Sequence, residues 1–334
     1  MTGCMNTEPI LHIENLSKWF PVRRTLQQLF TQQRTWVKAV DGITLRINAG
    51  EVFSLVGESG CGKTTLGKLV MKLFEPTGGR ILFQGQDVTN LSTGSVKAYH
   101  RNVQMIFQDP YASMNPRFRA RDVVAEPLLI HRVGKTRIER EQIIRQVLEQ
   151  VRLIPAEEFM DRFPHTLSGG QRQRVATART LVLSPKVIVA DEPVSMIDLS
   201  TRAEILHTLK TVQQELGLTY LYITHDLSTA RYFTDRIAVM YLGKIVERGS
   251  SHEVITHAAH PYTKALIAAV CEPVAGKVKT IKEIPIKGEI PSATKIPPGC
   301  RFHPRCLYAL PRCQEAEPAL IEMASNHHAA CHLL

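Results

Sequence analysis

Residues Gly57–Thr64 read GESGCGKT, a stretch that fits the pattern G-x-x-x-x-G-K-S/T. The apolar run VFSLV stands before it, and the helix-like run LGKLVMKL follows it. Glycines allow backbone N–H groups to curl around phosphate groups, and the start of a helix adds its positive dipole end. The sequence therefore predicts a phosphate-binding loop between a strand and a helix.

The polar residues of this loop have separate expected tasks. Lys63 can reach the β- and γ-phosphates of a nucleotide, and the Thr64 hydroxyl can ligate Mg²⁺. Cys61 is expected to fill a small space rather than to act as a reactive thiol. Lys63 also counts among the predicted catalytic residues. The predicted ATP and Mg²⁺ ligands of the loop are Gly57, Glu58, Ser59, Gly60, Cys61, Gly62, Lys63, Thr64 and Thr65.

An acidic pair follows the apolar run in KVIVADEP, residues 186–193. Asp191, at the end of the expected strand, is placed to hold Mg²⁺ through water. Glu192 follows as the candidate base for an attacking water. Together with the phosphate loop, this pair predicts a chain that binds a nucleoside triphosphate and Mg²⁺.

The hydrophobic pattern predicts an α/β fold. Three apolar runs, beginning at residues 186, 218 and 235, have helical stretches between them and favour a parallel sheet covered by helices on both faces. The N-terminal stretches 10–20 and 38–51 indicate strands, and 78–88 indicates a hairpin. Residues 21–36 are expected to form a loop or short helix. From about 97 to 180 the pattern is helical, with an amphipathic helix over IEREQIIRQVLEQVRL, residues 138–153.

Composition limits the possible classes of protein. The chain has 334 residues, of which 44% are hydrophobic and 22% charged, as is usual for a globular protein. The sequence has neither a bilayer-spanning apolar run nor a secretory signal pattern, so we expect a cytoplasmic protein. The net charge of +10 suggests an anionic partner, yet the basic residues are dispersed. A solvated basic surface explains the charge as well as a specific partner does.

The stretch LSGGQRQRVATARTLV, residues 167–182, distinguishes among phosphate-loop proteins. Ser168 is a good N-cap, and the two glycines after it permit close backbone approach at the start of a long helix. Here the sequence resembles the ATP-binding-cassette family, which has a core like that of RecA, an antiparallel β subdomain and a helical subdomain. The resemblance implies that this signature contacts the γ-phosphate bound by another subunit, in a head-to-tail dimer. The signature residues are Ser168, Gly169, Gly170 and Gln171.

The resemblance assigns four more residues, and it covers about residues 10–255. Phe20 in SKWF matches the aromatic residue that stacks on adenine, with Trp19 as the alternative. Gln108 in IFQDP matches the loop glutamine that senses Mg²⁺ and contacts the membrane partner. Asp198 in SMID matches the residue that couples the two sites of the dimer, although Met-Ile precedes it where Ala-Leu is common. His225 in ITHD matches the switch histidine near the γ-phosphate, and is a predicted catalytic residue together with Glu192.

Three further stretches resemble the ATP-binding subunits of the oligopeptide/dipeptide/nickel importer family: FQDPYASMNPR, HPYTKAL and the tail GCRFHPRC. The long segment between Phe20 and Lys38 is similar to the second of the two ATPase subunits in such systems. The resemblance implies a second ATPase subunit, two permeases and an extracytoplasmic substrate-binding protein as partners. It also implies a peripheral position on the cytoplasmic face of the inner membrane. The expected division is a cassette over 1–255, with its helical subdomain at about 97–180, and a C-terminal extension over 256–334.

Four cysteines stand in the tail, with spacings of five, six and seventeen intervening residues. These spacings lack the C-x₂-C knuckles common in structural zinc sites, and four thiolates suit iron–sulfur ligation. The family resemblance points in the same direction. We therefore expect a structural four-iron–four-sulfur cluster on Cys300, Cys306, Cys313 and Cys331. The alternatives are plain buried thiols or zinc, with His303, His327, His328 or His332 nearby.

Two other functions compete with transport. A nucleic-acid-associated ATPase would use the net charge of +10, but no recognition motif accompanies that charge. A regulatory, weakly catalytic cassette is the second alternative. The presence of Lys63, Gln108, Asp191, Glu192 and His225 argues against it. The leading hypothesis is thus an ATPase that powers a membrane importer for di- or oligopeptides or a related solute.

Overall fold

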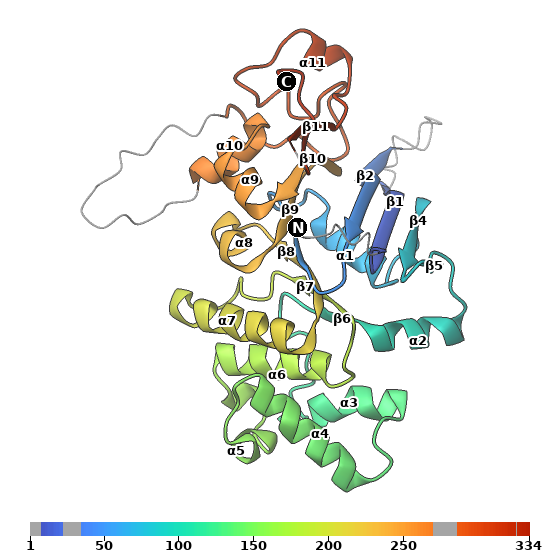
Figure 1. The fold of residues 1–334 in the computed structure, drawn as a ribbon, viewed down its shortest axis with the longest axis vertical. Helices are drawn as coiled ribbons and strands as arrows, with labels where there is room; N and C mark the ends of the chain where they lie inside the picture. Colours follow the sequence, from blue (N-terminus) through green and yellow to red (C-terminus); the bar gives the residue numbers. More distant parts are fainter. Residues whose placement is uncertain (1–7, 23–34, 270–285, 325) are drawn as a thin grey trace, which may run out of the picture.

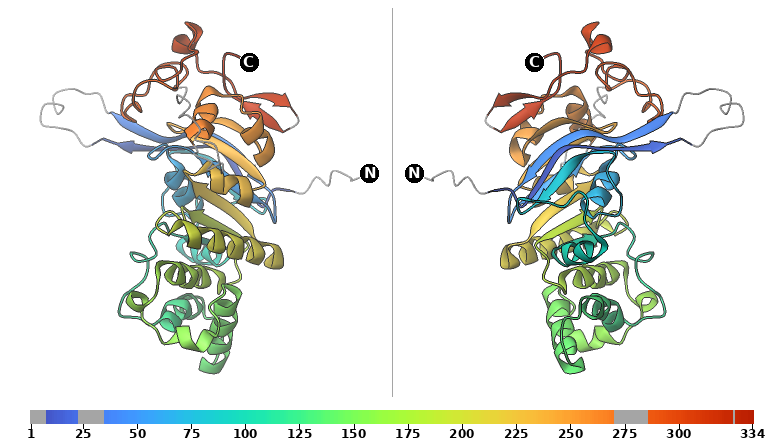
Figure 2. Two further views of the ribbon diagram at one scale, coloured as in Figure 1. Left: turned by 90° about the vertical axis from the view of Figure 1, so that its left-hand side faces the viewer. Right: turned by 90° about the vertical axis from the view of Figure 1, so that its right-hand side faces the viewer.

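The computed structural model describes the chain except for residues 1–7, 23–34, 270–285 and 325. Two sheets form the centre of the molecule (Figure 1). The larger has eight strands in the order β11-β12-β10-β9-β3-β8-β7-β6, and the smaller has four in the order β2-β1-β4-β5. Figure 2 shows a helical layer and the C-terminal residues at opposite ends of the molecule, with the sheets between them.

The parallel part of the large sheet carries the predicted phosphate loop and acidic pair. Its strands are β3 (Val52–Val56), β6 (Val103–Ile106), β7 (Val187–Asp191), β8 (Thr219–Thr224) and β9 (Arg236–Tyr241). Each neighbouring pair among them is parallel. Every residue of β3, β7 and β8 is buried, as expected for strands covered on both faces. The prediction of a parallel sheet built from three apolar runs is confirmed.

The small sheet is antiparallel and comes from the N-terminal part of the chain. It contains β1 (Leu11–Pro21), β2 (Trp36–Ile47), β4 (Gly78–Phe83) and β5 (Gln86–Asp87). Leu11 lies opposite Ile47 on one side and Phe83 on the other, and all three are buried. The predicted strands and hairpin are confirmed. Most of the expected loop over 21–36 lies outside the described residues.

Helices cover the large sheet and form a separate layer beside it. Near the sheet lie α1 (Lys63–Val70), α2 (Thr93–Asn102), α7 (Leu199–Leu216) and α8 (Leu227–Phe233). The layer contains α3 (Ala120–His131), α4 (Arg137–Gln150), α5 (Ala156–Met160), the 3₁₀ turn η2 (Pro164–Thr166) and α6 (Gly169–Leu181). None of the helices in the described ranges is both long and apolar enough to span a bilayer.

The helical layer contains the predicted amphipathic helix, but one strand interrupts the stretch that was expected to be helical. In α4, the predicted amphipathic helix, Thr136 and Glu139 form a capping box, and Ile144 and Leu148 are buried. The expected helical stretch from 97 to 180 is not helical throughout, because β6 interrupts it. Its run VQMI pairs in parallel with β7 at the edge of the large sheet. A run of four residues is too short for its period to separate strand from helix.

The C-terminal residues extend the large sheet instead of standing apart from it. After β10 (Lys244–Ser250) come α9 (Ser251–Thr256), α10 (Pro261–Ala269), α11 (Arg312–Glu315), β11 (Ile321–Ala324) and β12 (His327–Ala329). Strand β12 pairs with β10. Tyr241, Tyr262 and Phe302 share one buried cluster with Val56 of β3. The strands β10 to β12 were not predicted, and residues 270–285 of the expected extension lie outside the described part of the chain.

Candidate ATP site

The phosphate loop joins β3 to α1, as predicted, and its glycines are required by close packing. Gly62 has φ of 111°, and a Cβ at this position would lie 1.9 Å from the Ala39 carbonyl oxygen. A Cβ on Gly57 would lie 2.2 Å from the Met240 carbonyl oxygen. Backbone from β2 and β9 therefore fixes the loop from outside. Ser59 and Gly60 lie at its exposed tip.

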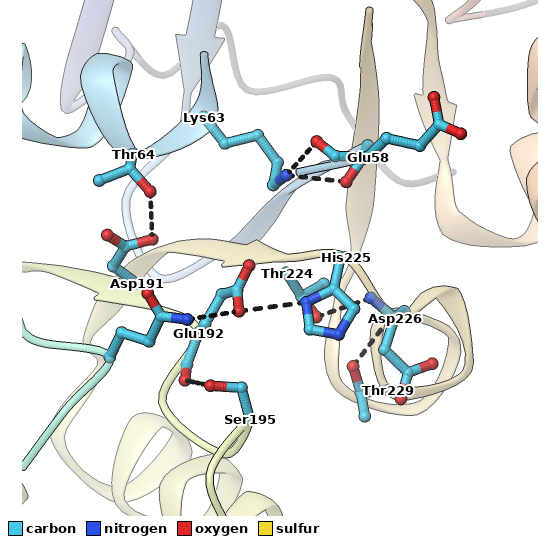
Figure 3. Close-up of polar contacts among 12 residues, drawn as sticks. Glu58, Lys63, Thr64, Asp191, Glu192, Ser195, Thr224, His225, Asp226 and Thr229 are labelled. Atoms are coloured by element: carbon cyan, nitrogen blue, oxygen red, sulfur yellow. Dashed lines mark hydrogen bonds and ion pairs between the residues drawn. The ribbon is translucent and has the colours of Figure 1, made fainter. Parts of the chain in front are cut away.

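Lys63 is the first residue of α1 and is only 4% exposed. Its Nζ donates to the carbonyl oxygens of Gly57 at 2.7 Å and Glu58 at 2.9 Å (Figure 3). The third contact of this ammonium group is a longer one, 3.8 Å to Cys61 Sγ, and it is the one that a phosphate oxygen can most readily replace. Cys61 is buried, and burial raises the pKa of its thiol, which fits the predicted role of a filler.

Thr64 and Asp191, the predicted Mg²⁺ residues, meet across the edge of the sheet. Thr64 Oγ1 donates to Asp191 Oδ1 at 3.1 Å (Figure 3). Burial raises the pKa of Asp191, and the hydrogen bond from Thr64 partly opposes this rise. Mg²⁺ in nucleotide sites is usually held by one or two side-chain oxygens together with substrate phosphates. These two residues fit that donor set. Thr65 follows Thr64 in α1 and is half-buried.

Two predicted residues from different parts of the chain, Gln108 and His225, converge on Glu192. Gln108 Nε2 donates to Glu192 Oε2 at 3.1 Å, and His225 Nδ1 lies 3.1 Å from the same oxygen. Figure 3 shows the histidine ring turned toward this carboxylate. Glu192 directly follows β7 with φ of 47°, and its N–H donates to Ile223 of β8 at 2.9 Å. The sheet thus positions the predicted base directly beside Asp191.

The signature begins α6 on the helical layer, away from α1 (Figure 1). Ser168 Oγ accepts from the Gln171 N–H at 3.2 Å, and Gln171 Oε1 accepts from the Ser168 N–H at 3.0 Å. This reciprocal capping box was not predicted, although Ser168 was expected to be the N-cap. A Cβ on Gly170 would lie 2.5 Å from Thr201 Cγ2 of α7. The exposed signature residues are Ser168 and Gly169, and Asp198 is exposed just before α7.

The two candidate adenine-stacking residues have different surroundings. The Phe20 ring packs edge-on against Phe74, with centroids 5.5 Å apart. Trp19 Nε1 donates to Asp41 Oδ1 at 3.2 Å, and Lys38 Nζ lies 4.5 Å from the Trp19 ring centre. Trp19 is thus tied to β2, while Phe20 contacts the segment after α1. Adenine stacking by Phe20 stays a prediction.

Comparisons with known proteins agree with this geometry. A family model described as ABC transporter matches residues 40–195. The oligopeptide transport ATP-binding protein AppF of Bacillus subtilis is 45% identical to the chain over 98% of both chains. The chain belongs to the ATP-binding-cassette transporter family. The dipeptide transport ATP-binding protein DppF of Haemophilus influenzae is 40% identical over 97% of this ABC ATPase and 96% of the relative.

Solved structures confirm the predicted cassette fold. A dimer of the ATP-binding cassette MJ0796, in a post-hydrolysis state with ADP and phosphate, matches this ABC ATPase with a TM-score of 0.63. It is 28% identical and covers 72% of this chain and 98% of its own. The protein cbiO1 of Clostridium perfringens, part of the transporter complex cbiONQ, also gives 0.63 at 28% identity, over 74% of this chain and 90% of its own.

The C-terminal part of this ABC ATPase matches a second family model over residues 246–313, described as the oligopeptide/dipeptide transporter C-terminal region. The four tail cysteines are all free, and Cys306 and Cys313 are buried. Burial is the main reason that the pKa of Cys300 is raised to about 11, and a hydrogen bond with the Phe302 backbone partly opposes the rise. The Cys300 N–H donates to the Cys313 carbonyl at 2.8 Å. The backbones of Cys300 and Cys313 therefore lie side by side.

This arrangement does not support the predicted metal centre. Across the ranges that the structure describes, no three or more His, Cys, Asp or Glu side chains are arranged to hold a metal ion. Histidines expected beside a zinc site contact other groups: His303 the Cys300 carbonyl, His327 Glu247, and His332 the Ala316 carbonyl.

Two residues that touch the phosphate loop were not predicted. Tyr262 of α10 and Arg305 of the tail both contact Glu58. Glu58 was predicted only as part of the loop that surrounds the phosphates. No local signal in one sequence identifies such contacts, because Arg305 stands 247 positions from Glu58.

Proposed function

We propose that this ABC ATPase energises a membrane importer of di- or oligopeptides, or of a related solute, as the second of two ATPase subunits. The observation that carries the proposal is the convergence of Gln108 and His225 on Glu192, beside the Thr64–Asp191 pair. Relatives named as oligopeptide and dipeptide transport proteins, alike over almost their full length, support the choice of cargo.

The residues suggest a division of labour in hydrolysis. The loop N–H groups and Lys63 would bind the phosphates, and Thr64 and Asp191 would hold Mg²⁺, which would supply positive charge beside them. Glu192 accepts a proton from the attacking water. Both contacts from Gln108 and His225 go to Oε2, so we assign Oε1 to the water. His225 and Gln108 orient the carboxylate, and His225 would lie beside the leaving phosphate.

The proposed partners are a second ATPase subunit, two permeases and an extracytoplasmic binding protein. We assign the permease contact to the Gln108 loop and the helical layer, where Leu129, Ile138 and Ile154 are exposed apolar side chains. The subunit then lies peripherally on the cytoplasmic face of the inner membrane. The proposed division is a cassette over 1–255 and an extension over 256–334, although β12 of the extension pairs with β10 of the cassette.

ATPase stimulation distinguishes this function from a nucleic-acid-associated one. The chain is purified together with its permeases and second ATPase subunit, and hydrolysis is measured with peptide-loaded binding protein or with DNA and RNA. We expect stimulation by the loaded binding protein and none by nucleic acid. Hydrolysis that rises with nucleic acid and falls steeply with salt would favour the alternative.

We also propose, on ligand softness and on the four-cysteine pattern of the tail, that Cys300, Cys306, Cys313 and Cys331 hold a structural four-iron–four-sulfur cluster, although the described side chains are not arranged as a metal site. Protein purified without oxygen is expected to be brown, with iron and acid-labile sulfide in equal amounts. Metal and sulfide analysis of the anaerobic protein checks this. A colourless preparation with stoichiometric zinc would replace the cluster by a zinc site, and a metal-free one would leave buried thiols.

A structural role for the site makes a separate prediction. Cys306→Ser is expected to lower the stability of the tail by about 2–5 kcal/mol, the range seen when a covalent staple is lost from a small fold. Limited proteolysis and thermal unfolding measure this change. Hydrolysis by the fraction that remains folded is expected to change much less. A variant with a normal tail and a large loss of turnover would contradict the structural role.

A further inference from the structure

The side chain of Glu58 is held by an arginine from the C-terminal extension. Arg305 Nη1 lies 2.6 Å from Glu58 Oε2, and Nη2 lies 2.9 Å from Oε1. The Arg305 side chain is 5% exposed and that of Glu58 is 24% exposed. Such two-pronged pairs combine strength with a fixed geometry. Figure 3 shows the Glu58 carboxylate pointing away from the Lys63 ammonium, so the pair lies on the outer side of the loop.

The backbone of the same residue is held as well. The Glu58 N–H donates to Tyr262 Oη at 2.9 Å. The Tyr262 ring packs on Tyr241 and Phe302, with centroids 4.7 and 5.4 Å away. The Arg305 guanidinium lies 5.9 Å from the centre of each of those two rings. A buried aromatic cluster thus holds in place both the Tyr262 hydroxyl and the Arg305 guanidinium, which contact Glu58.

A second arginine of the extension, Arg301, contacts strand β2 and the residue after β9. Arg301 pairs with Asp41 of β2 and donates to the Leu242 carbonyl after β9. Burial opposes ionisation of Asp41, but the hydrogen bond and charge of Arg301 prevail and hold its pKa below the usual value. The Gly243 N–H in turn donates to the Cys61 carbonyl of the loop at 2.9 Å. Two positions of the loop, Glu58 and Cys61, therefore have contacts that lead to the extension.

We propose that Arg305, with Arg301 in support, is a positioning residue for ATP: it holds the phosphate loop in its binding shape through Glu58. The Glu58 carbonyl accepts from Lys63 Nζ at 2.9 Å, so a shift of Glu58 moves the lysine that binds the phosphates. A loop fixed beforehand loses less entropy when ATP binds. ATP affinity consequently depends on the folded state of the extension. This inference rests on the proposed function as an ATPase.

The test compares dissociation constants for ATP in the full-length chain, measured with a fluorescent ATP analogue and with ATP in competition. Arg305→Ala and Glu58→Gln are each expected to weaken ATP binding by about tenfold, because each breaks a pair that is largely shielded from water. Arg305→Lys is expected to lie between wild type and Arg305→Ala, since an ammonium cannot form the two-pronged contact. In the assembled transporter, Arg305→Ala and Glu58→Gln are each expected to raise the KM for ATP by a larger factor than they lower kcat.

The double variant Arg305→Ala/Glu58→Gln provides the sharpest comparison. Residues that act as one unit give non-additive effects, so it should bind ATP about as weakly as either single variant. Arg312→Ala is the matched control, because Arg312 is an exposed arginine of the same tail, next to Cys313. It should bind ATP like wild type.

Three results would overturn the proposal. They are wild-type ATP affinity in folded Arg305→Ala and Glu58→Gln, additive losses in the double variant, or an equal loss in Arg312→Ala. If Arg305→Ala does not fold, Arg305→Lys and Glu58→Gln decide by the same criterion. Unchanged affinity in the variants, with normal hydrolysis by the wild-type transporter, contradicts only this inference. Absence of hydrolysis in the wild-type transporter contradicts the proposed function.

Discussion

Glu192→Gln is expected to reduce ATP hydrolysis by about 100-fold to 10,000-fold, the range for loss of a general base. Glutamine keeps the shape of the side chain and still meets Gln108 or His225, but it cannot take a proton from water. ATP binding should persist, because Lys63 and Thr64 are unchanged. The variant should therefore accumulate as an ATP-bound dimer, detectable by light scattering together with steady-state phosphate release.

Glu215→Gln is the matched control for this substitution. It removes the same charge from an exposed position on α7, outside the site, and should hydrolyse ATP like wild type. Near-normal turnover by Glu192→Gln would assign the proton acceptor to another group. Loss of ATP binding along with hydrolysis would show that the substitution disrupts the site.

Mixing two inactive variants is expected to restore hydrolysis if the signature works across a dimer. Chains carrying Lys63→Ala cannot bind the phosphates, and chains carrying Ser168→Arg block the start of α6. In a mixed homodimer, the intact loop of one chain faces the intact signature of the other, which makes one site free of both changes. Phosphate release by the mixture should clearly exceed that of either variant alone.

The control for the mixture is a chain that carries both changes. Mixed with Lys63→Ala chains, it supplies no intact loop, so hydrolysis should stay at the background level. Where the native pair consists of this chain and a different ATPase subunit, the two changes are divided between the two subunits. No gain over the separate variants, in a mixture shown to form mixed dimers, would place the signature's role within one chain.

Much of the fold follows from local sequence patterns. Fully apolar runs predict β7, β8 and β9, and the glycine loop predicts the step from β3 to α1. Strand β6 was missed because its four residues are too few to show a period and because helix α2 stands directly before it. Strand β12 was missed because it depends on β10 as its partner across the sheet.

The sequence likewise predicted some features of the candidate site and not others. Motifs predicted Thr64, Gln108, Asp191, Glu192 and His225, because each motif carries its chemistry within a few residues. Their convergence at distances of 3.1 Å is a property of the folded sheet. The grip of the extension on Glu58 could not be predicted, because it joins distant parts of the chain through a buried aromatic cluster.

The most direct test of the central claim is uptake of a labelled peptide into proteoliposomes. The complete transporter is reconstituted with the ATPase subunits facing the ATP and the binding protein on the other side. We predict accumulation of peptide against its gradient, only with hydrolysable ATP, and its loss when this chain carries Lys63→Ala. Accumulation that continues with Lys63→Ala, or hydrolysis by wild type without any ATP-dependent uptake, would contradict the account.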